Sequence, residues 1–307
     1  MRNHLNGFFF VLALLVGAAG GARAGEKPVL YWPYFNFPPY FITAPGAQPE
    51  GMGIDVARAL QKEMPGYEHV FIHASPQRIA EELQTGREPF AVSGLLKTPE
   101  REGHILYADI PCRVTFTVMV VMRREDLWRL APNGNASLAY LAADKGLTFG
   151  YVPGLSYDLA RPFVARLIST AGGQRATTAH DVGHLLDMLA EKRIDWFVHD
   201  SLSIRYVLDA RHMQERIAVV NAEECPPSPI FGYMACAWTE EGAAIMARIN
   251  GAMARLVASN RLCETLRKWI PEQLDTVFER AYARRILTAA HLAADGGACC
   301  REETAHP

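Results

Sequence analysis

The chain has 307 residues, with 31 lysines and arginines against 33 aspartates and glutamates, so its formal net charge is −2. A near-neutral charge argues against nucleic acid as a partner, because a phosphate backbone is held by an excess of basic side chains. Half of the residues are hydrophobic, and the length is sufficient for two domains with a core each.

The first 24 residues are typical of an export signal. Phe8–Val16 form an apolar run too short to cross a bilayer. Ala22-Arg23-Ala24 then has the small-x-small pattern of a signal-peptidase site. A buried N-terminal helix is the alternative, although the glycines after the run would weaken it. We therefore expect a cleavable signal peptide at 1–24 and a periplasmic location.

From Val29 onward, short apolar runs alternate with helical patterns, which is typical of α/β units built on mostly parallel sheets. Serine before proline, and a later glycine, are the start and stop signals of one of these helices. The expected elements of this first series are a strand at 29–31, a helix at 54–64, a strand at 70–72, a helix between Ser75 and Gly86, and a strand at 90–93.

A second series of elements follows the apolar, β-branched run Val114–Met122, whose composition suits a strand crossing between lobes. The expected elements are a strand at 147–152, a helix from about 156, a helix at 181–193, strands at 194–198, 217–220 and 231–238, and a long helix capped by Thr239.

The order of elements predicts two lobes. Residues 25–113 and 221–270 would form lobe 1, and 114–220, with the crossing strands, would form lobe 2. A ligand in such a fold lies between the lobes, at the carboxyl ends of strands. We expect 271–294 to form a helical extension that packs on lobe 1, and 295–307 to be a disordered tail.

The six cysteines show no metal-binding pair of the C-x-x-C type and no recognisable disulfide framework. An oxidising compartment permits disulfides, and Cys225 and Cys236 flank a proline-rich turn. They either pair or remain buried thiols. The other four are Cys112, Cys263, Cys299 and Cys300.

No catalytic pattern is present in the sequence. There is no G-x-S-x-G, no H-E-x-x-H, no Walker loop and no G-x-G-x-x-G. The ten histidines are scattered, without ligand spacing to cysteine or carboxylate. We therefore expect no catalytic residue, no metal site and no cofactor.

The loop after the first strand, YWPYFNFPPYF at 31–41, holds seven aromatics in eleven positions. Aromatic rings in such a loop can wall a ligand by stacking, while the prolines stiffen the chain. Packing in the core is the alternative for most of the rings. We expect Tyr34, Phe35 and Phe37 to reach the cleft.

The segment SGLLKTPER at 93–101 follows a strand and enters a helical turn. Backbone amides near Gly94 and Leu95, with the Arg101 guanidinium beside them, would form an anion site. The alternative for Arg101 is a solvated surface charge.

Two further features belong to the second series. The turn from Gly154 to Ser156 opens a helix and could present amides to the other side of an anion. His199 and Asp200 directly follow the strand IDWFV. The Asp200 carboxylate would either hold an ammonium group or cap the next helix, and the sequence leaves both open.

The order of these motifs resembles family 3 of the extracellular solute-binding proteins, the periplasmic receptors of polar amino-acid ABC transporters. The resemblance spans residues 28 to 270 and rests on six motifs in order. They are FPPY at 37–40, GMGIDVARAL at 51–60, SGLLKTPER at 93–101, YVPGLS at 151–156, LAEKRIDWFVHD at 189–200 and ARLVASNRLCETLRKW at 254–269.

The resemblance implies an α/β fold of the type II periplasmic-binding-protein kind, in which two lobes close like a Venus flytrap. It also implies roles for individual residues. Arg101 would bind a ligand carboxylate, Asp200 an amino group, and Phe37 would stack on the ligand, with the turn 154–156 completing the site from lobe 2.

The leading hypothesis is a monomeric periplasmic protein that delivers a small polar solute, an amino acid or a related carboxylate, to the membrane permease of an ABC transporter. Two alternatives remain. One is a sensor that reports its ligand to a membrane signalling partner. The other is an enzyme on the same fold, because fold does not fix function.

Export processing is directly testable. Because the apolar run precedes Ala22-Arg23-Ala24, the mature protein is expected to begin at Gly25. N-terminal sequencing of periplasmic material checks this, and a retained Met1 in a soluble product would contradict it.

Overall fold

The structure is a computed structural model that describes residues 27–169 and 176–294. The expected signal peptide, the tail at 295–307, and Cys299 and Cys300 lie outside the described residues. Within those residues, no helix combines the length and the apolar character that a membrane crossing requires.

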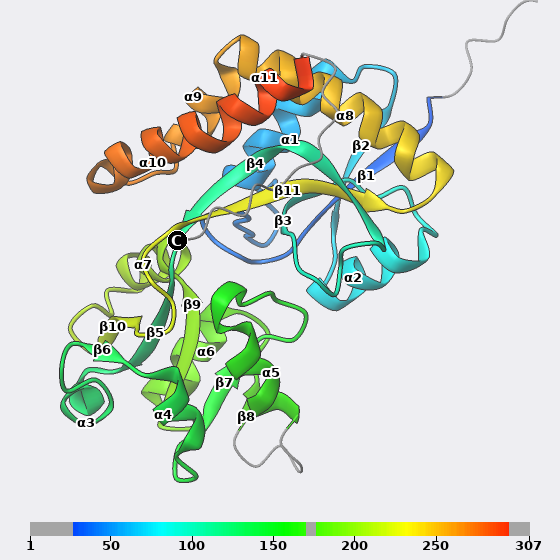
Figure 1. The fold of residues 1–307 in the computed structure, drawn as a ribbon. Helices are drawn as coiled ribbons and strands as arrows, with labels where there is room; N and C mark the ends of the chain where they lie inside the picture. The colour runs from blue at the N-terminus through cyan, green and yellow to red at the C-terminus, as the bar shows by residue number, and fades with distance from the viewer. Residues whose placement is uncertain (1–26, 170–175, 295–307) are drawn as a thin grey trace, which may run out of the picture.

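The two lobes of Figure 1 are joined where β4 continues into β5 and where β10 continues into β11. We call the part that contains β1 and the C-terminal helices lobe 1. Its elements are β1 (Val29–Tyr34), α1 (Met52–Glu63), β2 (Glu68–His73), α2 (Pro76–Thr85), β3 (Val92–Leu96), β4 (Ile105–Phe116), β11 (Pro229–Ala237), α8 (Glu240–Ala258) and α9 (Arg261–Arg267).

Lobe 2 is the segment between the two crossings. Its elements are β5 (Val118–Arg123), η1 (Arg124–Asp126), α3 (Leu127–Leu130), β6 (Asn135–Ala136), α4 (Leu138–Ala143), β7 (Phe149–Tyr151), η2 (Asp158–Ala160), α5 (Arg161–Ser169), β8 (Ala176–Thr178), α6 (Val182–Ala190), β9 (Trp196–Asp200), α7 (Ser201–Arg211) and β10 (Ile217–Ala222).

The sheets are mixed, so the expectation of mostly parallel sheets is wrong. Strands β1 and β2 pair in parallel, but β11 pairs antiparallel with both β3 and β4. In lobe 2 the order is β6-β10-β5-β9-β7-β8, and β5 is antiparallel to both its neighbours. The reason is geometric: the strands that enter and leave lobe 2 run in opposite directions.

Each lobe has its own main hydrophobic core. One cluster is built from lobe 2, with Phe149, Trp196 and Phe197 among its buried side chains. The other belongs mostly to lobe 1 and includes Trp32 and Ile249. Tertiary packing of these apolar faces, and not helix propensity alone, therefore supplies most of the stability of both lobes.

Local capping agrees with the sequence. Ser75 accepts a hydrogen bond from the amide of Arg78 and caps α2, which ends at Gly86 in the left-handed conformation. Thr239 caps α8 in the same way, through the amide of Gly242. Such caps satisfy backbone amides that a helix end leaves without partners.

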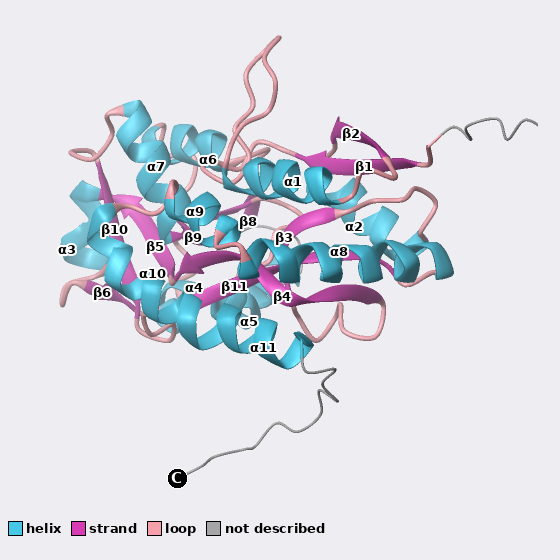
Figure 2. Ribbon diagram, turned by 90° about the horizontal axis from the view of Figure 1, so that it is seen from above, coloured by secondary structure: helices cyan, strands magenta, loops and turns pink. Residues whose placement is uncertain are grey.

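The C-terminal extension packs on lobe 1. It consists of η3 (Glu272–Leu274), α10 (Asp275–Ala281), a π-helical turn η4 (Tyr282–Leu287) and α11 (Thr288–Ala294). Figure 2 shows α10 and α11 alongside β11 and β4. Phe278, Tyr282 and Ile286 are buried in the lobe 1 core, so the extension covers the sheet that carries the crossing strands.

The four cysteines of the described residues are free thiols. Cys225 belongs to the core of lobe 2 and Cys236 to that of lobe 1. Of the two alternatives the sequence left open, the structure therefore shows buried thiols, and burial raises the pKa of each thiol, to about 11 for Cys225 and about 12 for Cys236.

Gly51 offers a test of the fold, because it turns the chain from the aromatic loop into α1 with a φ of 121°. A Cβ there would lie 2.7 Å from the Pro39 carbonyl oxygen and closer still to that of Tyr40. Backbone strain and steric overlap together should make Gly51→Ala destabilising by about 3 kcal/mol or more.

Urea denaturation measures this change, and Gly66→Ala is the matched control. A Cβ at Gly66 would meet no atom within 4 Å, so its effect should stay within about 1 kcal/mol. Equal stability of the two variants would contradict the close approach at Gly51.

Candidate functional site

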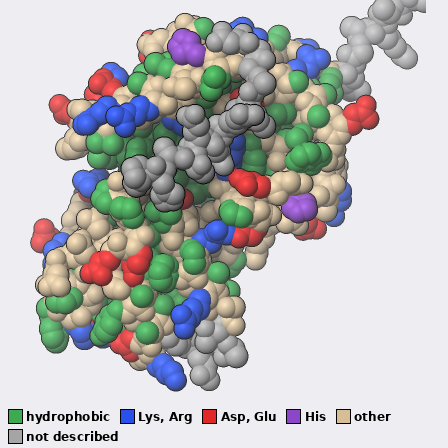
Figure 3. Space-filling view, viewed as in Figure 1, with side chains coloured by type: hydrophobic (Ala, Val, Ile, Leu, Met, Phe, Trp, Pro, Cys, Tyr) green, Lys and Arg blue, Asp and Glu red, His purple; other side chains and the backbone are tan. Residues whose placement is uncertain are grey.

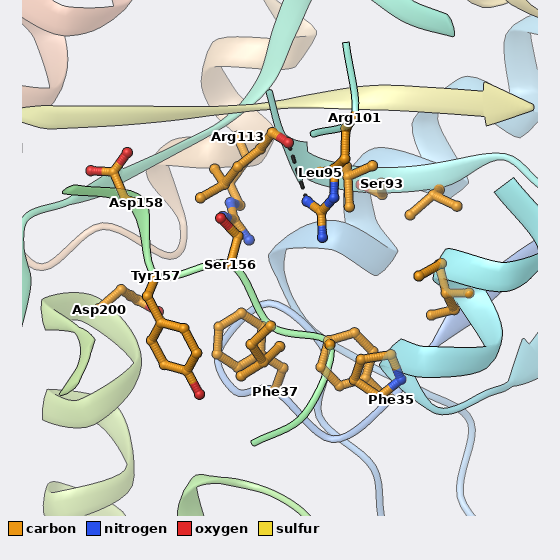
Figure 4. A pocket seen from close by; sticks show the side chains of 18 of the residues that line it. Phe35, Phe37, Ser93, Leu95, Arg101, Arg113, Ser156, Tyr157, Asp158 and Asp200 are labelled. Carbon is orange, nitrogen blue, oxygen red and sulfur yellow. Dashed lines mark hydrogen bonds between the residues drawn. The ribbon is translucent and has the colours of Figure 1, made fainter. Parts of the chain in front are cut away.

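A pocket lies between the lobes, below the crossing strand β11 in the close view of Figure 4. Lobe 1 lines it with the aromatic loop, α2, β3, β4 and the turn that follows β3. Lobe 2 lines it with the turn after β7 and the end of β9. On the outer face drawn in Figure 3, basic and acidic side chains are interspersed.

Nine of the ten predicted site residues line this pocket: Phe35, Phe37, Gly94, Leu95, Arg101, Gly154, Ser156, His199 and Asp200. Tyr34 is the tenth, and it does not line it. It is the last residue of β1, and its ring packs edge-on against Phe71 and His73 of β2. From the segment 31–41, Pro33, Phe35, Phe37 and Phe41 line the pocket, whereas Tyr34 does not.

Arg101 lies at the end of a turn that closes through the Arg101 amide and the Thr98 carbonyl, 2.9 Å apart. Its guanidinium donates to the Leu96 carbonyl at 3.2 Å and points into the pocket (Figure 4). Burial lowers the pKa of this guanidinium, although Tyr107 partly offsets the effect. A buried cation without a carboxylate partner favours an anionic ligand.

Asp200 has a structural role as well as a place in the pocket. Its Oδ1 accepts hydrogen bonds from the Tyr40 hydroxyl at 2.8 Å and the Thr115 hydroxyl at 3.0 Å. The same oxygen accepts from the Ser203 amide at 3.0 Å, which caps α7. The helix-cap alternative is thus observed. Because Tyr40 and Thr115 belong to lobe 1, this carboxylate also joins the two lobes.

Stacked aromatic rings form one wall of the pocket. Phe35 and Phe37 lie 5.7 Å apart with their planes 11° from parallel. The ring of His199, from lobe 2, meets Phe37 edge-on at 5.3 Å. This wall is therefore shared by both lobes, and its geometry suits a flat or apolar part of a ligand.

Further contacts hold the lobes against each other around the pocket. Glu100, beside Arg101, forms an ion pair with Arg161 at the start of α5. The Asn36 side chain donates to the Asp181 carboxylate at 2.7 Å. A Cβ at Gly154 would lie 3.0 Å from Pro76, so glycine permits this close approach. The structure therefore shows the lobes closed.

Sequence reasoning missed several polar lining residues: Arg113, Thr115, Tyr157 and Asp158. Both Arg113 and Thr115 are on β4. Thr115 lies in the run Val114–Met122, which suggested only a crossing strand, and Arg113 directly precedes that run. The signal available was a charged side chain next to a long apolar run, because such runs are mostly buried. No cluster of potential metal ligands is found in the described part of the chain.

Residues 34–272 match the bacterial extracellular solute-binding proteins, family 3. The chain belongs to this family. The match includes the aromatic loop, the Arg101 turn, the 154–156 turn and Asp200. It ends at the start of the C-terminal extension. Solute binding is therefore its role, and α/β lobes around a cleft are its architecture. A comparison with curated proteins finds no match.

Solved structures with the same fold cover most of this family 3 protein. An ancestral arginine-binding protein bound to arginine is 18% identical, with a TM-score of 0.63, and the match covers 80% of this chain and 99% of the other. A substrate-binding protein of an ABC uptake transporter from Streptococcus pneumoniae, bound to histidine, is 18% identical, with a TM-score of 0.62 and coverage of 80% and 92%.

The same fold also occurs in a histidine kinase sensor domain similar to periplasmic binding proteins. That domain is 17% identical, with a TM-score of 0.63, and the match covers 80% of this chain and 96% of the domain. At these identities the likeness concerns the fold, and the ligand of this protein has to be argued from its own pocket.

The buried ring of His199 predicts a pH dependence. Its Nε2 lies 3.0 Å from the Ser203 hydroxyl, and burial lowers the pKa of the imidazole below its ordinary value of 6.5. The unfolded chain takes up this proton as the pH falls through 6.5, whereas the folded protein takes it up only at lower pH. The free energy of unfolding should therefore fall as the pH drops below 6.5.

Chemical denaturation between about pH 7.5 and 5.5 measures this loss. His199→Gln should lose less stability over that window than the parent protein. It should not abolish the loss, because burial also lowers the pKa of His69. The control is His104→Gln, at an exposed position, which should behave as the parent. Identical pH profiles for the parent and His199→Gln would refute the role of this ring.

Proposed function

We propose that this protein captures a small carboxylate-bearing solute between its lobes in the periplasm and delivers it to the permease of an ABC transporter. The observation that carries the proposal is the Arg101 guanidinium in the interlobe pocket. Among the described residues it has no carboxylate partner, and its hydrogen-bond partners are a carbonyl and the Tyr107 hydroxyl. A ligand carboxylate would satisfy it.

Closure of the lobes accounts for capture. Among the described elements, the chain passes between the lobes only from β4 to β5 and from β10 to β11. A change in backbone angles at these two crossings would therefore separate the lobes. Opening breaks the Glu100–Arg161 ion pair and the Asn36–Asp181 hydrogen bond and exposes the pocket. A ligand that contacts both lobes favours the closed state by its differential affinity for that state.

Binding occurs without chemical turnover in this proposal, and the protein acts as a monomer. The pocket offers guanidinium groups, aromatic walls and a carboxylate already engaged in hydrogen bonds. The related structures bound to arginine and histidine support a ligand of amino-acid size. Native mass spectrometry of the periplasmic protein, together with thermal shift against a metabolite library, would identify the ligand. Its recovery with unchanged mass after incubation supports binding without turnover.

Arg101→Gln tests the proposal with that ligand. The variant removes the charge that holds the carboxylate, so binding should weaken by roughly 30-fold or more, since truncating one partner of a buried charge pair costs about 2 to 5 kcal/mol. Its thermal stability without ligand should stay near that of the parent, because the guanidinium has no carboxylate partner to lose.

Titration calorimetry measures affinity, and small-angle scattering with and without ligand measures closure as a smaller radius of gyration. Arg280→Gln is the control, since Arg280 is exposed on the C-terminal extension. Binding by Arg101→Gln within about threefold of the control, a difference of roughly 0.7 kcal/mol, would overturn the proposal.

A further inference from the structure

A second guanidinium lines the same pocket. Arg113 extends from β4, and its guanidinium lies over the Tyr40 ring, 4.5 Å from the centroid. Its Nε is buried and has no hydrogen-bond partner. In the described part of the chain, Arg113 forms no ion pair with any carboxylate. A buried donor without a partner is costly, so the site is incomplete without a ligand.

The position of Arg113 is held by packing. A Cβ at Gly94 would lie 3.1 Å from Arg113 Cδ, so the arginine stem passes directly over this glycine of β3. Tyr40 supports the guanidinium from its other side by a cation–π contact, and the Tyr40 hydroxyl is itself bound to Asp200. Arg113 is therefore a positioned group and not a solvated surface charge.

Lobe 2 presents a matching group. The Ser156 hydroxyl is buried and has no hydrogen-bond partner, and Ser156 lines the same pocket as Arg113 (Figure 4). Two polar groups without partners, one from each lobe, thus line one pocket. A ligand oxygen accepting from both would satisfy them only when the lobes are closed.

Two carboxylates, Asp200 and Asp158, line the pocket together with these two arginines. Asp200 Oδ1 already accepts three hydrogen bonds, from Tyr40, Thr115 and the Ser203 amide. Asp158, the other lining carboxylate, is drawn in Figure 4 turned away from Arg101. Neither carboxylate forms an ion pair with Arg101 or Arg113. The two guanidinium groups therefore have no carboxylate partner within the pocket.

We infer that the ligand is a dicarboxylate on a compact apolar skeleton, with one carboxylate on Arg101 and the second on Arg113 and Ser156. This inference rests on the proposed function and specifies its ligand. The apolar part of the wall accommodates the skeleton. It includes Phe35, Phe37, Ile79, Leu83, Val92 and Ile105.

Two matched sets of compounds test the inference. L-phenylalanine, 3-phenylpropanoate and benzylmalonate share one skeleton and differ in bearing an ammonium, a hydrogen or a second carboxylate at the same carbon. L-leucine, 4-methylpentanoate and isobutylmalonate form the aliphatic set. Calorimetry at about pH 8 keeps both malonate carboxyls ionised. At least one malonate should bind tenfold or more tightly than both other members of its set.

Arg113→Gln should weaken binding of that malonate at least tenfold and change binding of the matching monocarboxylate less than threefold. Ser156→Ala is the second variant, because it removes a hydroxyl that has no partner, so the fold loses no hydrogen bond. It should reduce malonate binding about threefold and leave the monocarboxylate unchanged. Arg280→Gln serves again as the control, and thermal unfolding verifies that each variant is folded.

Three results would overturn the inference. They are an amino acid binding more tightly than the malonate of its set, equal weakening of malonate and monocarboxylate by Arg113→Gln, and binding of none of the six compounds. Each leaves the proposed function to its own test, in which Arg101→Gln is measured with the ligand found in the metabolite library. If binding of the ligand requires Arg101 but not Arg113, only the inference of a dicarboxylate ligand is refuted.

Discussion

The closed structure depends on the hydrogen bonds of one carboxylate. Asp200 Oδ1 caps α7 in lobe 2 and accepts from the hydroxyls of Tyr40 and Thr115 in lobe 1. Hydrogen bonds to a charged group each contribute about 1.5 to 3 kcal/mol. Two of the three join lobe 2 to lobe 1. The residue that ends β9 is therefore both part of the fold of lobe 2 and part of the closure of the protein.

Tyr40 contacts both Asp200 and the guanidinium of Arg113. It is buried, and its pKa is raised well above the ordinary value, chiefly by burial and then by the Asp200 charge. The hydroxyl therefore remains protonated and donates to Asp200, while the face of the ring holds Arg113. Tyr40 thus contacts both Asp200, whose Oδ1 accepts three hydrogen bonds, and Arg113, which forms no ion pair with a carboxylate of the described residues.

Local signals in the sequence predicted most of the fold and several of the segments that line the pocket. Caps such as Ser75 and Thr239, and the turns at Gly86 and Gly154, depend on nearby residues and can be identified from the chain alone. Arg113 and Tyr40 could not be assigned, because their contact joins β4 to a loop more than seventy residues earlier in the chain. The strand directions of β4 and β11 were missed for the same reason: pairing across two crossings leaves no local pattern.

Both arginines are held by contacts within lobe 1. Arg101 donates to the Leu96 carbonyl, and the stem of Arg113 passes over Gly94. Preorganisation of this kind reduces the entropy lost on binding. Ser156, in contrast, reaches the site only when lobe 2 closes. In the proposed mode of binding, lobe 1 would provide most of the affinity for an anion, and the hydroxyl from lobe 2 would make closure depend on where the second negative group lies.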